Sequence, residues 1–372
     1  MRKTSSVITA VLFAAVLLIV PLCWLCLPEK TFSESERRYL AEAPKLSEQD
    51  LKNWSFDDAV EGYLADHLPL RDTFVGINAY ATLFSGRQVS GEIWRDRDGY
   101  LVEAPVDFHY TEVARRVEKI ASLSKTTGTP VSVLIVPSAG YIRSSHLPQR
   151  LATLYRDNTV LKQFQQNEGI RFVPLAARFS REGQDWYYRT DHHWTADGAF
   201  AAYEAYMETA GHTPLTRDAF TRRALYGYTG STRSRSALWL TKPDTLMIDA
   251  PDNTQVRVTF SDDKTVYDSL FFEEHLKEYD WYPVFIDGNH PVTVIENLSA
   301  PDDAPVLLMV KDSFGNTLAP LLVPSYRTVV MVDQRFYRGA VSDLCSEYKA
   351  DEILFCYSIE RISTDLNLLL LK

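Results

Sequence analysis

Three near-continuous apolar segments in the C-terminal part of the chain constrain its fold most strongly. They are residues 306–310, 328–332 and 352–357, each of strand length and rich in Val, Leu, Ile or Phe. Strands with one face in water alternate apolar and polar residues, whereas strands covered on both faces read as unbroken apolar runs. The intervening segments are long enough for crossover helices. The pattern therefore predicts an α/β doubly wound domain with a parallel central sheet.

The middle of the chain extends this pattern and then departs from it. Further strands are predicted at 131–136 and 171–175, and the apolar periodicity predicts helices at 111–125, 161–166 and 196–210. Between about 213 and 291 the sequence is richer in loop-like Gly and Ser, and 255–260 has the composition of an exposed strand. We interpret this stretch as a partly β insertion that forms one wall of a substrate cleft.

The N-terminal segment predicts export. Arg2 and Lys3 precede an apolar run from about Val7 to Leu27, and roughly 20 apolar residues can span a membrane as a helix. Basic residues ahead of such a run place the N-terminus in the cytoplasm. The alternative is a cleaved signal peptide, but Trp24 and Leu25 stand where its small residues should be. We therefore predict an uncleaved single-pass anchor in the cell membrane, with the remaining chain extracytoplasmic.

The chain divides into three parts on this interpretation. Residues 1–28 form the cytoplasmic tip and the anchor. Residues 29–95 form a tether and an N-terminal helical segment, because 48–83 has helical periodicity. Residues 96–372 form the α/β domain with its insertion.

Charge and cysteine content exclude two classes of function. The formal net charge is −10, and basic residues are not concentrated in any long run, so we expect no nucleic-acid partner. In the exported part only Cys345 and Cys356 are present, without metal-ligand spacing. An oxidising exterior permits a disulfide, but the apolar strand around Cys356 favours two buried thiols. No cofactor and no metal are expected.

The segment Lys311-Asp312-Ser313-Phe314-Gly315-Asn316 follows a predicted buried strand directly. Open α/β sheets place ligands at the carboxyl ends of their strands. If a helix begins here, its first N–H groups and its dipole favour an oxyanion beside Ser313. Ser313 is therefore a candidate nucleophile, and Gly315 would let substrate approach the backbone. The alternative is that Asp312 and Ser313 only cap the helix.

The segment Tyr187 to Thr195 supplies a candidate base. A serine nucleophile needs a base, and the base needs an orienting carboxylate. Asp191 and His193 are two residues apart, directly ahead of a predicted helix, and His192 is expected to point elsewhere. A metal site is an alternative interpretation, although no further ligand is evident nearby. Another is that Thr195 only caps the following helix and the histidines lie on the surface. We predict a catalytic triad of Asp191, His193 and Ser313.

Several segments resemble a known family. The tetrad Asp191-His192-His193-Trp194 resembles the motif that names the bacterial DHHW proteins, which in turn resemble the alginate O-acetyltransferase branch of the SGNH-hydrolase superfamily. In that branch an Asp-x-His-Trp motif supplies acid and base and a later serine is the nucleophile. Lys311 departs from the usual Gly-Asp-Ser block. The resemblance extends over most of the exported chain and includes Phe32-Ser33-Glu34, Asp98-Gly99-Tyr100-Leu101, Gly288-Asn289-His290-Pro291 and Val332-Asp333-Gln334-Arg335-Phe336-Tyr337.

The resemblance implies an SGNH-hydrolase-like, flavodoxin-like three-layer sandwich and O-acetyl transfer to an envelope polysaccharide through an acetyl-serine. The alternatives are an O-acetylesterase with the same triad and a non-catalytic polysaccharide-binding or assembly protein. A multi-pass membrane acyltransferase is the implied acetyl donor. Asn289 and Asn316 are weaker candidates for oxyanion donors, and Arg335 is one for substrate contact. Tyr188 is a weak candidate for stacking on sugar, with core packing as its alternative role.

Overall fold

The computed structural model describes residues 2–26, 30–33, 38–45, 55–87, 89–90 and 92–372. The chain forms two compact units. The smaller unit contains Met1–Gly91 and Ser234–Leu240, and the larger contains Glu92–Arg233 and Thr241–Lys372.

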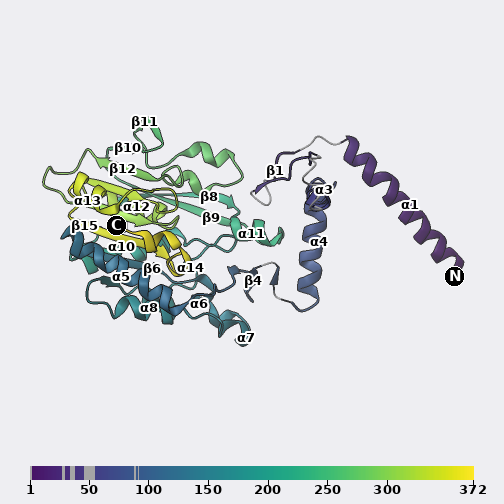
Figure 1. The fold of residues 1–372 in the computed structure, drawn as a ribbon, viewed down its shortest axis with the longest axis horizontal. Coiled ribbons are helices and arrows are strands. Elements are labelled where there is room, and N and C mark those ends of the chain that lie inside the picture. The colour runs from purple at the N-terminus through teal and green to yellow at the C-terminus, as the bar shows by residue number, and fades with distance from the viewer. Residues whose placement is uncertain (1, 27–29, 34–37, 46–54, 88, 91) are drawn as a thin grey trace. The chain divides into compact units, whose positions relative to one another are not determined.

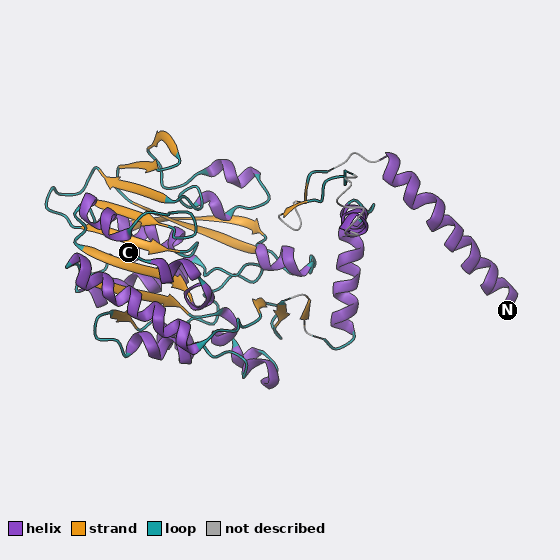
Figure 2. Ribbon diagram, in the orientation of Figure 1, coloured by secondary structure: helices purple, strands orange, loops and turns teal. Residues whose placement is uncertain are grey.

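The larger unit is built on a mixed sheet (Figure 2). In spatial order its strands are β11 (Asp263–Tyr267), β10 (Val256–Phe260), β12 (Val292–Asn297), β14 (Thr328–Val332), β13 (Val306–Lys311), β15 (Glu352–Ser358), β6 (Val131–Val136) and β7 (Arg171–Val173). The five strands from β14 to β7 pair in parallel, and the other three pair antiparallel. The predicted α/β class with a large, mostly parallel sheet is confirmed.

Helices cover both faces of this sheet (Figure 1). Side chains on one face of the strands, such as Leu134, Met309 and Leu354, share a core with α9 (Leu175–Glu182), α10 (Ala196–Ala210) and α12 (Gly315–Leu322). The opposite face packs on α5 (Tyr110–Thr127), α8 (Asp157–Gln165), α13 (Val341–Tyr348) and α14 (Ile359–Thr364). Two cores on two faces explain why the central strands carry no alternation.

The range predicted as an insertion has two different structural roles. β8 (Phe220–Tyr228) and β9 (Asp244–Pro251) pair antiparallel in a sheet of their own. β10 and β11, by contrast, extend the main sheet, because β10 pairs with β12. β10 is also not an exposed strand, since Val256, Val258 and Phe260 are buried in the main core. The expectation of an exposed strand at 255–260 is therefore wrong.

Shorter elements complete the larger unit. β4 (Ile93–Arg95) pairs antiparallel with β5 (Leu101–Glu103), and α6 (Ala139–Ile142) and α7 (Gln149–Ala152) follow β6. Cys345 on α13 and Cys356 on β15 are both buried and free. They belong to the cores on opposite faces of the sheet. The preference for two buried thiols over a disulfide is confirmed.

The smaller unit contains α1 (Arg2–Cys26), of which Val7–Trp24 is long and apolar enough to cross a membrane. β1 (Phe32–Ser33) pairs with β2 (Arg38–Tyr39), and the helices α3 (Ser55–Asp66) and α4 (Arg71–Phe84) follow. The helical periodicity predicted over 48–83 is interrupted between α3 and α4, at the segment that holds Pro69. Residues 48–54 lie outside the described part of the chain. Trp239 packs so closely on Gly76 of α4 that a Cβ there would collide with its ring.

Candidate active site

Asp191, His193 and Ser313 meet at the carboxyl end of β13. Ser313 Oγ lies 2.7 Å from His193 Nε2, and His193 Nδ1 lies 2.5 Å from Asp191 Oδ1. Asp191 and His193 are buried, and Ser313 is partly exposed. An ionised Asp191 holds the proton on Nδ1, which leaves Nε2 to accept the hydrogen bond from the serine hydroxyl. In this geometry His193 Nε2 can accept the hydroxyl proton of Ser313 during nucleophilic attack.

A short hairpin-like loop positions the acid and the base. The Tyr188 N–H donates to the His193 carbonyl at 3.1 Å, and the Thr195 N–H donates to the Trp186 carbonyl at 2.8 Å. At the tip, Asp191 Oδ1 accepts the His193 N–H at 3.0 Å, a local turn that Asp often makes. Asp191 Oδ2 accepts the Ser231 N–H at 2.6 Å. Asp191 therefore holds the loop and the imidazole together.

Asp312 holds the serine turn rather than joining the proton relay. Its Oδ2 accepts the Ser358 N–H at 2.7 Å, at the end of the neighbouring strand β15. Its Oδ1 accepts the Phe314 N–H at 3.0 Å. Asp312 thus ties the turn that carries Ser313 to the sheet.

Aromatic packing joins the two segments. The Trp194 indole N–H donates to Thr317 Oγ1 at 2.5 Å, which links the loop before α10 to the first turn of α12. The ring of Tyr282 stacks on that of His193, with centroids 3.6 Å apart and planes 8° apart. The Tyr282 hydroxyl also donates to the Ser313 carbonyl at 3.2 Å. The base is therefore held between a stacked ring and two hydrogen bonds.

Burial and neighbouring charges act in opposite directions on the pKa values of Asp191 and His193. Burial favours the neutral form of Asp191, but the charges of His192 and His193 and two hydrogen-bond donors outweigh it and hold the pKa of Asp191 well below 3.8. Burial and the neighbouring His192 lower the pKa of His193 to about 4, although Asp191 acts in the opposite direction. At neutral pH His193 is therefore a neutral base beside an ionised carboxylate.

His192 does not point away from the site as expected. Its ring lies against that of His193, with centroids 3.8 Å apart, and its Nδ1 lies 2.7 Å from Ser231 Oγ. The turn at Asp191 causes this, because it abolishes the strand-like alternation on which the expectation rested. Neither Ser231 nor Tyr282 was predicted, since no local sequence signal relates them to the motif.

The N–H groups of the serine turn are mostly engaged. Phe314 donates to Asp312 Oδ1, Gly315 donates to the Asp312 carbonyl at 3.1 Å, and Asn316 donates to the Ser313 carbonyl at 3.2 Å. The expectation that the first helical turn offers these groups to an oxyanion is wrong. Among the described residues the Ser313 N–H has no hydrogen-bond acceptor, so it remains the backbone donor next to the nucleophile.

Lys311 explains the surroundings of Asn289 and Asn316. Its buried ammonium donates to Asn289 Oδ1 at 2.9 Å and to Asn316 Oδ1 at 2.6 Å. Asn316 is completely buried and supports this network, so it is not placed to contact substrate. Asn289 is exposed. Of the two, only Asn289 remains a candidate oxyanion donor.

Glycine is needed at position 315 for a different reason from the one predicted. A Cβ at this position would lie 2.7 Å from the Cβ of Lys311 and 3.0 Å from its Cγ. The aliphatic part of a buried lysine thus fills the space beside Gly315. The glycine accommodates Lys311 rather than an approaching substrate.

Two further predicted residues are engaged in the protein. Tyr188 is buried and packs edge-to-face on Tyr228, with centroids 5.1 Å apart, so it cannot stack on a sugar. Arg335 donates twice to Asp333, at 2.9 and 2.5 Å, while its side chain stays 23% exposed. Its predicted contact with substrate stays a prediction.

Within the described part of the chain, two groups of residues bring potential metal-ligand atoms within 4.8 Å of one another. The first is Asp191 with His192 and His193, whose atoms are engaged with each other and with two serines. The second is Asp96, Asp98 and His146. There Arg143 donates to Asp96 at 2.7 Å and to Asp98 at 3.2 Å, which supplies the positive charge that a cation would bring.

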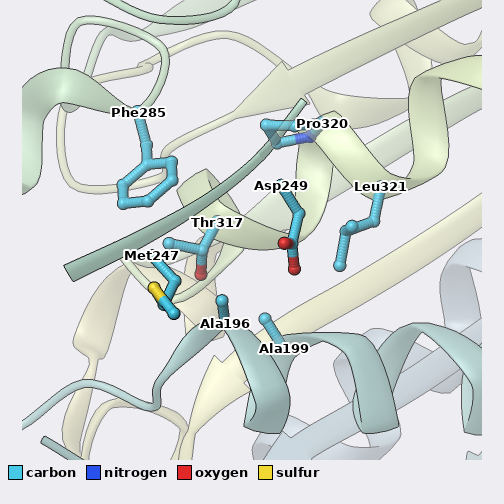
Figure 3. A pocket seen from close by; sticks show the side chains of 8 residues that line it. All are labelled: Ala196, Ala199, Met247, Asp249, Phe285, Thr317, Pro320 and Leu321. Atoms are coloured by element: carbon cyan, nitrogen blue, oxygen red, sulfur yellow. The ribbon is translucent and has the colours of Figure 1, made fainter. Parts of the chain in front are cut away.

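A small pocket lies between α10, α12 and β9 (Figure 3). Ala196 and Ala199 of α10, Thr317 and Leu321 of α12, and Met247 and Asp249 of β9 line it together with Phe285 and Pro320. None of the three triad residues lines this pocket. It marks the junction of α10, α12 and β9, apart from the triad.

The fold and the site together define an α/β protein with a Ser-His-Asp arrangement at the carboxyl end of its parallel strands. The family model of the DHHW proteins matches residues 134–332, which is more than half of the chain. The chain belongs to the DHHW family. Comparison with curated proteins found no matching relative.

Comparison with solved structures found similar chains. A DHHW family protein from Eubacterium siraeum is 19% identical with a TM-score of 0.62, covering 76% of this chain and 95% of its own. PatB1 of Bacillus cereus, solved with a sulfonyl adduct, is 23% identical with a TM-score of 0.64, covering 75% and 98%. The O-acetyltransferase domain of Pseudomonas putida AlgJ is 16% identical with a TM-score of 0.47, covering 73% and 92%. At these identities the first two similarities establish the fold alone.

Proposed function

We propose that this protein is an SGNH-hydrolase-like O-acetyltransferase that acts on an envelope polysaccharide through an acetyl-serine at Ser313. The observation that carries the proposal is the continuous relay from Asp191 through His193 to the partly exposed Ser313 hydroxyl, with distances of 2.5 and 2.7 Å. Geometry of this kind activates a serine that is otherwise a poor nucleophile. PatB1, which shares the fold, was solved with a sulfonyl adduct, the type of product that an activated hydroxyl forms.

The reaction has two balanced halves. His193 Nε2 takes the hydroxyl proton of Ser313 while Oγ bonds the acetyl carbonyl carbon, and the resulting oxyanion collapses and expels the donor's leaving group, which receives the proton from His193. A sugar hydroxyl then gives its proton to His193 and bonds the acetyl carbon. Collapse releases the sugar ester, and the proton returns to Ser313 Oγ.

Two groups are proposed to stabilise the oxyanion. The Ser313 N–H lies next to the nucleophile, and the Asn289 side chain lies on the exposed side of the Lys311 network. Donors fixed in place before reaction stabilise developing charge without reorganisation. Arg335 is proposed to contact the substrate.

The N-terminal helix supports a proposed topology. We propose that residues 1–28 anchor the protein in the cell membrane, that 29–95 form a tether and helical segment, and that 96–372 act outside the cytoplasm. Acetyl groups outside the membrane require a carrier, so we propose a multi-pass membrane acyltransferase as the donor partner. The acceptor is then a polysaccharide within reach of the membrane surface.

The test separates transfer from hydrolysis. Full chain in detergent micelles is given an acetyl ester with a labelled acetyl group, with and without oligosaccharide acceptors. Transferase activity places label on the sugar at the expense of free acetate. Release of acetate alone, unaffected by any acceptor, identifies the esterase alternative, and no turnover by the chain favours the non-catalytic binding protein.

The pH dependence of this reaction follows from the base. Since only neutral His193 accepts the serine proton, kcat/KM should rise with pH through a single acid limb centred near pH 4, the pKa of His193. Asp191 stays ionised through this range because its pKa is held well below 3.8. A profile measured at constant ionic strength checks this expectation. A limb centred near 6.5, the ordinary histidine value, would show that burial does not govern the base.

A further inference from the structure

Lys311 is a buried cation one residue before the turn that carries Ser313. It is 1% exposed and donates to the side-chain oxygens of Asn289 and Asn316. The Asn316 amide nitrogen in turn donates to Asn289 Oδ1 at 3.3 Å. Two donors therefore converge on one oxygen of Asn289. Within the described part of the chain the Asn289 amide nitrogen has no hydrogen-bond acceptor.

An ammonium group has three donors and no acceptor, so only the oxygen of an amide can face it. The two asparagines next to Lys311 consequently cannot flip. For Asn289 this directs the N–H₂ group away from Lys311, on the exposed side of the network. A neutral amine has a lone pair and accepts as well as donates, so it would tolerate either orientation of the amide.

The surroundings keep this cation in place. Asp333 Oδ2 lies 3.9 Å from the Lys311 nitrogen, beyond direct hydrogen bonding, and Arg335 is paired with the same carboxylate. Asp312 and Cys356 also face Lys311. Burial is the main cause that lowers the pKa of Lys311 to about 8, against the attraction of Asp333, while Arg335 lowers it further. Gly315 gives the aliphatic chain the room it needs.

We propose that Lys311 is a positioning residue that fixes the Asn289 amide with its N–H₂ group toward the oxyanion. This inference rests on the proposed function, because it concerns the same reaction at Ser313. It assigns a role to the residue that replaces glycine in the Gly-Asp-Ser block. Lys311 itself touches neither substrate nor nucleophile on this account.

Kinetic coupling tests the proposal. In full chain in detergent micelles, with 4-nitrophenyl acetate as substrate, Asn289→Ala should lower kcat about 10²-fold, the usual effect of losing one oxyanion donor. Lys311→Met keeps an unbranched chain beside Gly315 and should lower kcat similarly while changing KM less. The double variant should be no slower than Asn289→Ala, because the lysine acts through the asparagine. Multiplied losses in the double variant would overturn the proposal.

The alkaline limb of the profile provides a second readout that does not depend on the folding of Lys311→Met. In the parent, kcat should fall as pH rises through about 8, the pKa of Lys311, because the neutral amine no longer fixes Asn289. In Asn289→Ala this limb should be absent, since no donor is left to misorient. A limb that persists in Asn289→Ala, or a parent without one, would overturn the proposal.

Failure of the proposed function is distinguishable. A parent chain that neither hydrolyses the ester nor forms a sulfonyl adduct at Ser313 with phenylmethylsulfonyl fluoride lacks an activated serine, and both proposals then fall. If the parent is active but the rate losses of the two single variants multiply in the double variant, only the proposed role of Lys311 is rejected and the proposed function stands.

Discussion

Replacing Ser313 with alanine should reduce acetyl-ester hydrolysis by the full chain to background, a loss of at least roughly 10³-fold. The variant removes the atom that lies 2.7 Å from His193 Nε2 and would form the acetyl intermediate. It should also abolish labelling by phenylmethylsulfonyl fluoride, as read by the mass of the intact protein and of the peptide that contains residue 313. Thermal denaturation should be nearly unchanged, because Ser313 is partly exposed.

Ser231 offers a matched control within the same site. Its Oγ also lies 2.7 Å from His192 Nδ1, but Asp191 Oδ1 approaches this same nitrogen, at 3.6 Å. Within the described residues no carboxylate binds the other nitrogen of that ring, so no relay runs through it to Ser231. Ser231→Ala retains the backbone N–H that donates to Asp191. Its activity should stay within roughly threefold of the parent, as for substitutions that remove one peripheral hydrogen bond. Equal losses in the two serine variants would refute the assignment of Ser313 as nucleophile.

Asp191→Asn should lower kcat about 10⁴-fold with little change in KM. The amide can donate to His193 Nδ1 and so favours the tautomer whose Nε2 carries the proton and cannot accept one from Ser313. It also no longer stabilises the imidazolium that forms in the transition state. Steady-state kinetics with the chromogenic ester give the effect, and circular dichroism verifies that the fold is retained.

Asp244→Asn is the corresponding control. Asp244 accepts hydrogen bonds from the N–H groups of Arg189 and Thr190, each at 2.8 Å, and so supports the same loop without touching His193. Removal of this carboxylate should destabilise the loop but leave the rate of the chemical step nearly unchanged. A rate loss equal to that of Asp191→Asn would mean that loop support, and not orientation of the imidazole, explains the effect.

The central strands could be predicted because burial on both faces leaves a local signature. Strands β13, β14 and β15 are almost entirely apolar, and they pair in parallel. The antiparallel edge of the main sheet could not be predicted in this way. β10 alternates buried and less buried residues, a pattern that is identical for a separate hairpin and for an antiparallel edge of the main sheet. Only its pairing with β12, a non-local contact, decides between them.

In the candidate site too, residues in local motifs could be predicted, whereas residues brought in by non-local contacts could not. Asp191, His193 and Ser313 stand in short motifs whose chemistry is readable from residue type and spacing, and the structure brings them within hydrogen-bond distance. Tyr282 and Ser231 come from segments far from both motifs, so their contacts depend on the fold. The function of Gly315 was misjudged because its neighbour in space is the side chain of Lys311, four residues earlier.

The hydrogen bond between Trp194 and Thr317 has a consequence for how such a protein can diversify. It fastens the loop that carries the base to the helix that follows the nucleophile, within a buried junction of α10 and α12. The reacting distance is thereby set by the packed interior, while the long segment between the two motifs adds Ser231 and Tyr282 to the surroundings of Asp191 and His193. On the proposed function, exchange of outer loops can then alter which acceptor hydroxyl is used and leave the proton relay intact.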